Sequence, residues 1–224
     1  MRDQIAGTTP TRPPFEERLR SVRVLPVVEI DDAAAAIPLA EALLAGGIGC
    51  VEITFRTAVA AAAIAAIRHA VPGMLVAAGT VLSPDQVDVA RDAGVAFLVS
   101  PGLGPSVVRR AAEVGLPLLP GACTPTEIQA ALEAGFRAVK FFPAEAVGGI
   151  PYLRALAGPF RDVAFVPTGG IDAGNLAEYL AVPGVVACGG SWLVRKEWIA
   201  AGDFAAVTSA AREAARIVAE ARGA

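Results

Sequence analysis

The chain has 224 residues, of which 54% are hydrophobic and 18% charged, and its formal net charge is −3 at pH 7. This composition excludes a disordered chain, which needs low hydrophobicity and high net charge, and it gives no electrostatic support for nucleic-acid binding. The mean hydropathy of +0.55 is high, but the longest charge-free stretches, 93–108 and 179–194, have only 16 residues. Because a membrane-spanning helix needs about 20 apolar residues, we expect a soluble protein with no membrane partner.

The two ends and the cysteines give less information. The first 22 residues contain prolines and charges but no apolar core of a secretory signal, so we expect a cytoplasmic protein. We interpret residues 1–22 as a tail followed by a short helix over 15–22, and residues 1–224 as one domain. Cys50, Cys123 and Cys188 are widely spaced and form no CxxC pair, which indicates thiols in a reducing compartment.

Short apolar runs alternate with alanine-rich segments along the whole chain. The runs predict strands, in chain order, at Arg23–Ile30, Gly49–Thr54, Leu75–Gly79, Phe97–Ser100, Leu116–Pro120, Ala138–Phe141, Ala164–Pro167 and Val185–Gly189. The alanine-rich segments predict helices at Ala33–Ala45, Ala58–Ala70, Pro84–Ala93, Pro105–Val114, Pro125–Ala134, Pro151–Ala157, Ala173–Leu180 and Phe204–Ala221. Ser83 and Thr124 stand where N-caps are expected, and glycines that follow the predicted helix ends are Gly46, Gly94, Gly115 and Gly135.

Eight such βα units predict the fold class. Strands that are apolar along most of their length indicate a parallel sheet buried on both faces. Eight units in about 200 residues favour a compact α/β protein of the (β/α)8 TIM-barrel type, with a short N-terminal helix before it. The alternative is an open, doubly wound sheet, which usually has a glycine-rich loop after its first strand. Here Asp31 and Asp32 follow that strand instead.

Lys140 is the most informative residue, because it lies in a strand between Val139 and Phe141. Burial disfavours the charged form of an amine, and a neutral lysine can attack a carbonyl carbon to form a Schiff base. The alternative is a structural lysine that pairs with a carboxylate at a strand end. The only other lysine, Lys196, lies in a charged segment after the eighth strand, and we interpret it as an ordinary surface residue.

Glu52 is the other charged residue in a predicted buried strand. An inward carboxylate near Lys140 could hold its ammonium group, and could also transfer protons. Sequence alone does not separate these two roles. Arg56, just beyond the strand, is a candidate for binding a substrate carboxylate. The alternative, an arginine on the solvated surface, agrees equally well with the sequence.

Paired glycines end the seventh and eighth predicted strands. They are Gly169–Gly170 and Gly189–Gly190, the second pair followed by Ser191. Barrels often build a phosphate site from backbone N–H groups at these two strand ends, so we expect a substrate that carries a phosphate or a comparable anion. The single histidine, His69, falls at a predicted helix end, and the sequence has no histidine cluster for a transition metal. We therefore expect neither a metal nor a cofactor.

Together these strand-end motifs resemble 2-keto-3-deoxy-6-phosphogluconate (KDPG) aldolase, the Schiff-base class I aldolase of the Entner–Doudoroff pathway. The resemblance runs from about Val22 to Trp192 and rests on the phrases Val51–Thr57, Ala78–Leu82, Ser100–Gly102, Leu119–Gly121, Val139–Glu145, Gly158–Phe160, Pro167–Ile171 and Gly189–Leu193. It implies a metal-independent carbon–carbon lyase (an aldehyde-lyase) that yields pyruvate and D-glyceraldehyde 3-phosphate. It further implies a homotrimer of (β/α)8 barrels, often also active on 4-hydroxy-2-oxoglutarate, which lacks the phosphate.

The resemblance also implies roles for individual residues. Lys140 would form the imine, and Glu52 would be the general acid and base, working through a water. The pyruvyl carboxylate would be bound by Arg56, Thr80 and the peptide around Pro101. Phe142 and Thr168 would line the substrate cavity, and the phosphate would be held by Gly169, Gly170, Gly190 and Ser191.

One departure from the family pattern is at Glu29, where some relatives have an arginine. A carboxylate that faces the pocket there would repel a phosphate. The alternatives on substrate and reaction are an aldolase for the 6-phosphogalactonate epimer, and an isomerase or epimerase barrel that transfers protons with Glu52 and forms no imine. A phospho-sugar binding barrel without catalysis has no need of a lysine in a buried strand, and a metal-dependent aldolase would be inhibited by a chelator.

Overall fold

The computed structural model describes residues 15–223. The predicted tail over 1–14 lies outside the described residues, whereas the predicted short helix is present as α1 (Phe15–Val22). Within the described part, eight strands occur in the predicted chain order: β1 (Val24–Val28), β2 (Cys50–Thr54), β3 (Leu75–Gly79), β4 (Phe97–Val99), β5 (Leu118–Leu119), β6 (Ala138–Phe141), β7 (Ala164–Pro167) and β8 (Cys188–Gly190).

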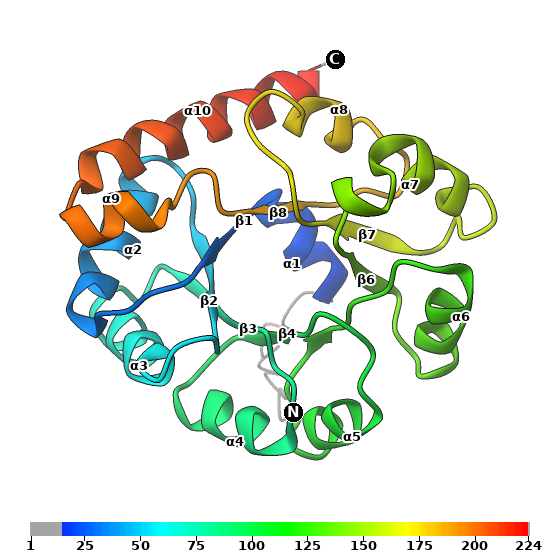
Figure 1. The fold of residues 1–224 in the computed structure, drawn as a ribbon, viewed down its shortest axis with the longest axis horizontal. Coiled ribbons are helices and arrows are strands. Elements are labelled where there is room, and N and C mark those ends of the chain that lie inside the picture. Colours follow the sequence, from blue (N-terminus) through cyan, green and yellow to red (C-terminus); the bar gives the residue numbers. More distant parts are fainter. Residues whose placement is uncertain (1–14, 224) are drawn as a thin grey trace, which may run out of the picture.

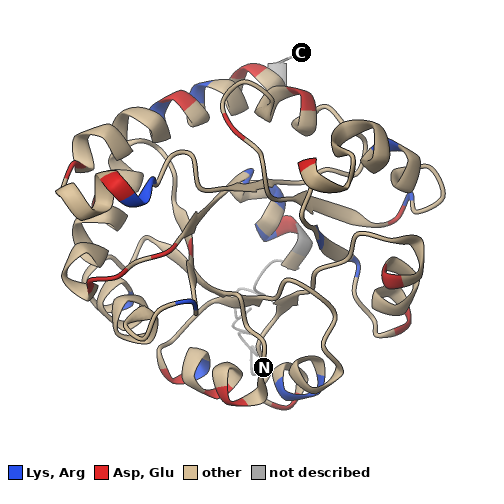
Figure 2. Ribbon diagram, in the orientation of Figure 1, with Lys and Arg blue, Asp and Glu red and all other residues tan. Residues whose placement is uncertain are grey.

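The helices between the strands lie on the outside of the molecule, around the strands (Figure 1). They are α2 (Ala36–Ala45), α3 (Ala60–Ala70), α4 (Pro84–Asp92), α5 (Pro105–Glu113), α6 (Pro125–Glu133), α7 (Gly149–Ala157), α8 (Leu176–Leu180), α9 (Lys196–Ala201) and α10 (Phe204–Gly223). Two short 3-10 helices, η1 (Ala33–Ala35) and η2 (Glu145–Val147), precede α2 and α7. Figure 2 shows that charged residues lie mainly on these outer helices and on the loops.

All strand pairs are parallel. Six strands form one sheet in the order β5-β4-β3-β2-β1-β8, and β6 pairs with β7 in a second sheet. Single parallel bridges connect the two sheets, between Gly121 and Lys140 on one side and between Thr168 and Gly189 on the other. The predicted α/β fold with parallel strands is therefore present. In the part of the chain that the structure describes, the two sheets meet through single bridges rather than through full ladders.

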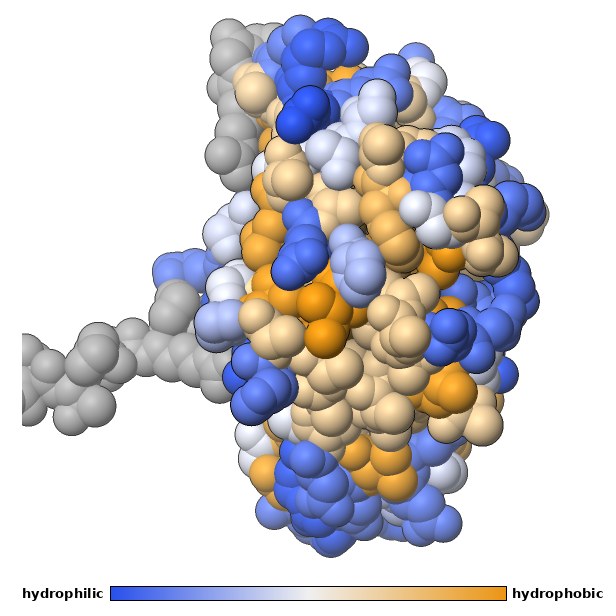
Figure 3. Space-filling model, turned by 90° about the vertical axis from the view of Figure 1, so that its left-hand side faces the viewer, coloured by the Kyte–Doolittle hydropathy of each residue, from blue (hydrophilic) through white to orange (hydrophobic). Residues whose placement is uncertain are grey.

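The core is made by strand residues and by the inner faces of the helices, as the apolar composition requires. The alanine-rich α2 and α3 bury small side chains such as Ala40 and Ala63 completely. The N-terminal helix α1 packs on the same core, because Leu19 is buried and the Phe15 ring lies 5.3 Å from the ring of Phe97. Figure 3 shows the face over α2, α3 and α9, where a broad apolar area is bordered by hydrophilic residues. No helix in residues 15–223 is long and apolar enough to cross a membrane.

Helix ends follow the predicted local signals. Ser83 and Thr124 accept hydrogen bonds from the backbone N–H groups of Gln86 and Glu127, and Glu127 completes a capping box on α6. The glycines after α4, α5 and α6 have the positive φ expected of a helix C-terminus. After α2 the predicted glycine, Gly46, is the C-cap, and the positive φ falls on the next residue, Gly47. Gly46 allows α10 to pack closely against the end of α2, because a Cβ added at Gly46 would lie 2.3 Å from the Cβ of Ala211.

Several boundaries differ from the prediction. The strand β5 is only Leu118–Leu119, because Pro117 and Pro120 on either side lack the N–H that a ladder needs. The helix α9 is missing from the prediction because it is short and begins among charged residues, and it ends at Gly202 with a left-handed backbone. The α8 segment is shorter than predicted, and α7 begins two residues before the predicted Pro151.

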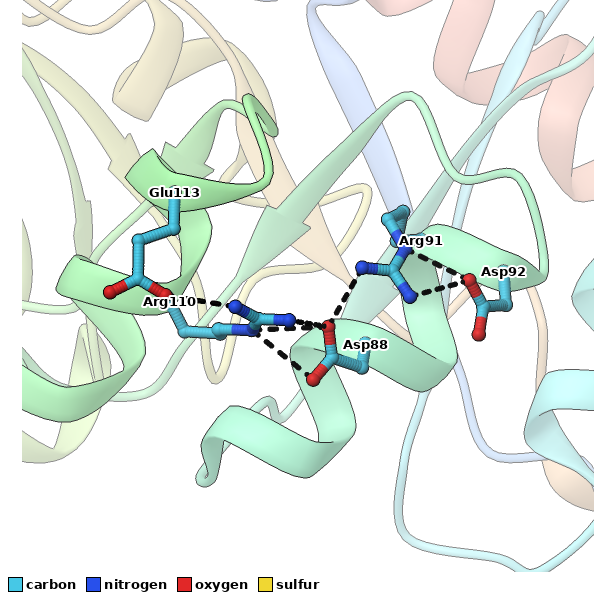
Figure 4. A network of polar contacts seen from close by, with 5 residues as sticks. All are labelled: Asp88, Arg91, Asp92, Arg110 and Glu113. Carbon is cyan, nitrogen blue, oxygen red and sulfur yellow. Dashed lines mark hydrogen bonds and ion pairs between the residues drawn. The ribbon is translucent and has the colours of Figure 1, made fainter.

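On the outer surface, α4 and α5 are joined by a network of ion pairs (Figure 4). Arg110 of α5 donates two hydrogen bonds to Asp88 of α4, from Nη2 at 2.7 Å and from Nε at 3.1 Å. Arg91 also pairs with Asp88, at 3.0 Å, and Arg110 pairs with Glu113 at 2.9 Å. These contacts hold the pKa of Asp88 below its usual value, mainly through the hydrogen bond from Arg110.

Candidate active site

Lys140 and Glu52 form a buried ion pair between two strands that are far apart in the sequence. The Nζ of Lys140 on β6 lies 3.3 Å from Oε1 of Glu52 on β2. Lys140 is 6% exposed and Glu52 1%, so water screens their charges little. The Lys140 ammonium also lies 5.4 Å from the centre of the Phe142 ring. The two charged residues that the sequence places in buried strands are therefore in direct contact.

The space for Glu52 comes from a glycine on the neighbouring strand. Gly79 ends β3, and an added Cβ there would lie 2.2 Å from Oε1 of Glu52 and 2.5 Å from its Cγ. The other carboxylate oxygen, Oε2, is buried and has no hydrogen-bond partner among the described residues. A buried carboxylate oxygen without a donor is costly, so this atom is suited to accept a proton or a hydrogen bond from a bound molecule.

A cavity of about 580 Å³ lies next to this pair. Its wall includes Thr54 at the end of β2 and Phe142 just after β6, so it reaches the strand ends that carry Glu52 and Lys140. Its position at the carboxyl ends of parallel strands is where α/β barrels hold their active sites. The wall residues are Val27, Glu29, Thr54, Arg56, Phe142, Thr168, Gly169, Gly170, Ile171, Asp172, Gly190, Ser191, Trp192, Val194, Arg195, Lys196 and Glu197.

The glycine loops of the seventh and eighth strands form one side of the cavity. Gly169 and Gly170 have φ angles of +101° and +78°, which other residues rarely adopt. Side chains also occupy the space beside these loops. A Cβ on Gly189 would lie 2.4 Å from the Thr168 hydroxyl, and one on Gly190 would lie 2.0 Å from the Trp192 ring. The missing Cβ atoms therefore let Thr168 and Trp192 pack closely against these loops, whose backbone N–H groups are candidates for binding an anion.

The mouth of the cavity is lined with charged residues that form ion pairs. Lys196 Nζ donates to Oε1 of Glu29 at 3.0 Å and lies 2.8 Å from Oδ2 of Asp31, and Arg56 lies 3.7 Å from Glu29. The hydrogen bond to Asp31, followed by the one to Glu29, raises the pKa of Lys196. Lys196 is exposed, as predicted, but its ion pairs hold it at the end of β1 and it lines the cavity. The segment Arg195–Lys196–Glu197 looks like a solvated run in sequence, but α9 brings it back to the end of β1.

Four predicted site residues are not part of the cavity wall: Lys140 and Glu52, on the strands whose ends the cavity reaches, and Thr80 and Pro101. Thr80 directly follows Gly79 and has a φ of +56°, a conformation that is uncommon outside glycine. Pro101 lies beside a different hollow, of about 420 Å³, together with Leu82 and Leu103. Its carbonyl oxygen would lie 2.0 Å from a Cβ on Gly121, so Gly121 allows these two strand ends to approach. The other predicted binding residues, Arg56, Phe142, Thr168, Gly169, Gly170, Gly190 and Ser191, all line the main cavity.

Two further side chains near the site were not predicted to have a role. Tyr179, buried on α8, donates a hydrogen bond to Glu145 in the loop after β6. Burial and this carboxylate raise the pKa of Tyr179. Gly170 packs on Glu145, so the Tyr179–Glu145 contact supports the loop that contains Gly169 and Gly170. Trp192 lines the cavity, and its indole N–H is buried without a partner in the part of the chain that the structure describes. No spacing rule in the sequence connects Tyr179 with Glu145.

The histidine and the cysteines lie away from the pair. His69 is exposed in the last turn of α3, which confirms the helix-end prediction. Cys50 and Cys188 are buried, and their burial raises the pKa of each thiol, whereas Cys123 is half-buried. Among residues 15–223, no three or more His, Cys, Asp or Glu side chains are grouped so that they could hold a metal ion.

With the site described, comparison with known proteins identifies the family. A model of the family described as KDPG and KHG aldolase matches residues 15–210, which is most of the chain. The chain belongs to this family. A 2-dehydro-3-deoxy-phosphogluconate aldolase from Treponema pallidum is 53% identical over 202 residues, which cover 90% of this chain and 96% of that protein.

Solved structures of family members have the same fold. The KDPG aldolase of Legionella pneumophila, with pyruvate captured as a covalent carbinolamine intermediate, matches with a TM-score of 0.85 and 40% identity, over 88% of this chain and 96% of that one. A native KDPGal structure matches with a TM-score of 0.82 and 31% identity, over 90% of this chain and 96% of that one. A carbinolamine forms when a nucleophilic amine adds to a carbonyl carbon.

Proposed function

We propose that this protein is a class I aldolase that cleaves 2-dehydro-3-deoxy-6-phosphogluconate to pyruvate and D-glyceraldehyde 3-phosphate. The observation that carries the proposal is the buried contact of 3.3 Å between Lys140 Nζ and Glu52 Oε1, beside a cavity with two glycine loops. Family membership and the covalent carbinolamine of the Legionella pneumophila relative support a Schiff-base mechanism. The reaction needs no cofactor, because the lysine itself supplies the electron sink.

Lys140 is the proposed nucleophile. Its Nζ lone pair attacks the C2 carbonyl carbon of the keto acid, and the oxygen of the resulting carbinolamine leaves as water after it gains a proton. The iminium ion that remains draws the electrons of the C3–C4 bond toward C3 when that bond breaks. The amine must lose its proton before it attacks, and Glu52 is the base in contact with it.

Glu52 is the proposed general acid and base for the later steps. Cleavage of the C3–C4 bond requires removal of the proton from the C4 hydroxyl, so that this carbon leaves as an aldehyde. The enamine then gains a proton at C3, and water releases pyruvate from the iminium ion. The Oε2 atom of Glu52, which has no partner among the described residues, is free to carry these protons, directly or through a water.

The proposed substrate-binding roles combine the cavity wall with the family resemblance. We propose that Arg56, Thr80 and the peptide at Pro101 bind the pyruvyl carboxylate, and that Phe142 and Thr168 line the reacting carbons. The phosphate is placed at the loops of Gly169, Gly170, Gly190 and Ser191. Support for Arg56, Phe142, Thr168 and the loops is their place in the cavity wall, whereas Thr80 and Pro101 are assigned from the family resemblance.

Activity measurements on variants test this proposal. The wild-type protein should release pyruvate from 2-dehydro-3-deoxy-6-phosphogluconate, and Lys140→Arg should lose activity almost completely, because a guanidinium keeps its charge and forms no imine. An isomerase or epimerase that uses only Glu52 would retain appreciable activity in Lys140→Arg. That result, or a wild type that releases no pyruvate, would refute the aldolase proposal.

The second candidate is an aldolase for the 6-phosphogalactonate epimer. The identity of 53% with a gluconate-series relative, against 31% with the KDPGal structure, favours the gluconate series. The ratio of kcat/KM on the two epimers decides between them. Measurement on 4-hydroxy-2-oxoglutarate tests the proposed activity on a substrate without phosphate, for which the KHG part of the family description provides support.

The architecture around the site is also a proposal. We infer that the eight strands close into a (β/α)8 barrel, supported by the single bridges that connect the six-stranded and the two-stranded sheet on both sides. We further propose that the protein is a homotrimer in the cytoplasm, as the family resemblance implies, with the phosphorylated keto acid and pyruvate as its small-molecule partners.

A further inference from the structure

We propose that Lys196 binds the phosphate of the substrate, and that it sets the preference of this protein for phosphorylated over unphosphorylated keto acids. This inference rests on the proposed cleavage of a phosphorylated substrate. It concerns a residue outside the glycine loops that lines the same cavity. The argument starts from the position of Lys196 in the cavity.

Lys196 is the first residue of α9 and lines the same cavity as Gly170, Gly190 and Ser191. A phosphate held by those loops therefore lies in the cavity that Lys196 also faces. Figure 1 shows α9 beyond the end of β8, on the same side of the molecule as the segment after β1. The side chain is 53% exposed, so its ammonium is accessible from the mouth of the cavity.

The hydrogen bonds of Lys196 fix its position without using all its donors. A lysine ammonium has three N–H donors. Glu29 Oε1 at 3.0 Å and Asp31 Oδ2 at 2.8 Å take two of them. Two anchors from the segment that follows β1 reduce the freedom of an otherwise flexible side chain, and one donor remains for an oxygen of a ligand. An ammonium held in this way loses less entropy when it binds an anion.

The charges around the mouth show why a cation is needed there. Glu29 and Asp31 would repel a phosphate dianion, and Lys196 contacts both of them. Arg56 is at 3.7 Å from Glu29, a longer contact than either contact of Lys196. The charged residues of the cavity wall are the cations Arg56, Arg195 and Lys196 and the carboxylates Glu29, Asp172 and Glu197, so without Lys196 the wall would carry a net negative charge. Lys196 contacts Glu29 directly and so offsets the repulsion that this carboxylate would exert on a phosphate. The contacts with Asp31 and Glu29 also raise the pKa of Lys196, so it stays charged at neutral pH.

Steady-state kinetics on two substrates test this inference. Lys196→Ala should raise KM for 2-dehydro-3-deoxy-6-phosphogluconate about tenfold, the effect of losing one charge-assisted hydrogen bond. KM for 4-hydroxy-2-oxoglutarate, which has no phosphate, should stay within about twofold of wild type. Lys196→Arg should retain most of the affinity for the phosphorylated substrate, because it keeps the charge.

A matched control is Arg216→Ala on α10, which removes another ion-paired surface cation, bonded to Glu220 at 2.7 Å. It should leave both KM values unchanged. If Lys196→Ala changes both substrates equally, or neither, Lys196 is a structural residue and the inference is wrong. If the wild type does not cleave the phosphorylated substrate at all, the proposed function itself fails, so the two failures are distinguishable.

Discussion

At the scale of single residues, the site depends on glycines as much as on charged groups. Lys140 and Glu52 could be identified from the sequence, because a charged residue in an apolar strand is rare without a partner. The sequence could not show that the two side chains are in contact, because β2 and β6 are far apart in the chain. The sequence also could not show why residue 79 is a glycine. Only the structure shows that the Glu52 carboxylate occupies the space that a side chain at Gly79 would fill.

Gly79→Ala tests whether the Glu52 position matters for catalysis. The added Cβ would lie 2.2 Å from Glu52 Oε1, so the carboxylate must move. A displacement of about 1 Å of a catalytic group can reduce the rate about 100-fold, and we expect kcat to fall by roughly that factor. Gly73→Ala is the control, because nothing lies within 4 Å of its Cβ position. A Gly79→Ala variant with wild-type kcat would show that the placement of Glu52 is not critical.

At the scale of elements, local signals predicted most helix ends but not the elements that close the site. The capping residues Ser83 and Thr124 work through hydrogen bonds within one turn, so the sequence contains the whole interaction. The helix α9 is only Lys196–Ala201, and its place depends on ion pairs with the segment after β1. Such long-range contacts leave no local pattern, which is why the place of Lys196 at the cavity was not predicted.

The contact between α4 and α5 gives a prediction about acid stability. Arg110 holds the pKa of Asp88 below its usual value, so the pair adds stability above the unfolded pKa of about 3.9. This stability is lost as the pH falls through the lower folded pKa. Asp88→Asn should therefore unfold more easily than wild type at pH 7 in urea, and the difference should shrink below about pH 4.

Asp92→Asn serves as the control for this measurement. Asp92 is more exposed and pairs with Arg91 of its own helix, so its loss should change the urea midpoint less. An Asp88→Asn variant with the same deficit at pH 7 and at pH 3 would show that the ion pair is not the cause.

At the scale of the whole molecule, composition and periodicity predicted the α/β class and the chain order of eight strands. The strands β3, β6 and β7 have the predicted bounds, whereas β5 is shorter than predicted because prolines lie on either side of it. The cavity could be located in advance only as a region at the carboxyl ends of the strands. Its shape depends on glycine loops and on α9, which approach each other only in the folded chain.

The proposed homotrimer predicts a property of the molecule in solution. Exposed apolar residues such as Leu82, at 63%, and Val89, at 46%, are candidates for burial between copies. Sedimentation equilibrium should give about three times the chain mass of 22.8 kDa. A monomer mass over the micromolar range would contradict the trimer while leaving the chemistry of Lys140 untouched.

The central claim is that Lys140 forms a covalent imine. Incubation with pyruvate and sodium borohydride should reduce the imine to a stable secondary amine, and peptide mass spectrometry should find the modification on Lys140. Lys196 should remain unmodified and so provides a control within the same chain. A modified Lys140 is the result we predict, and the absence of any pyruvate adduct on Lys140 would contradict the proposed mechanism.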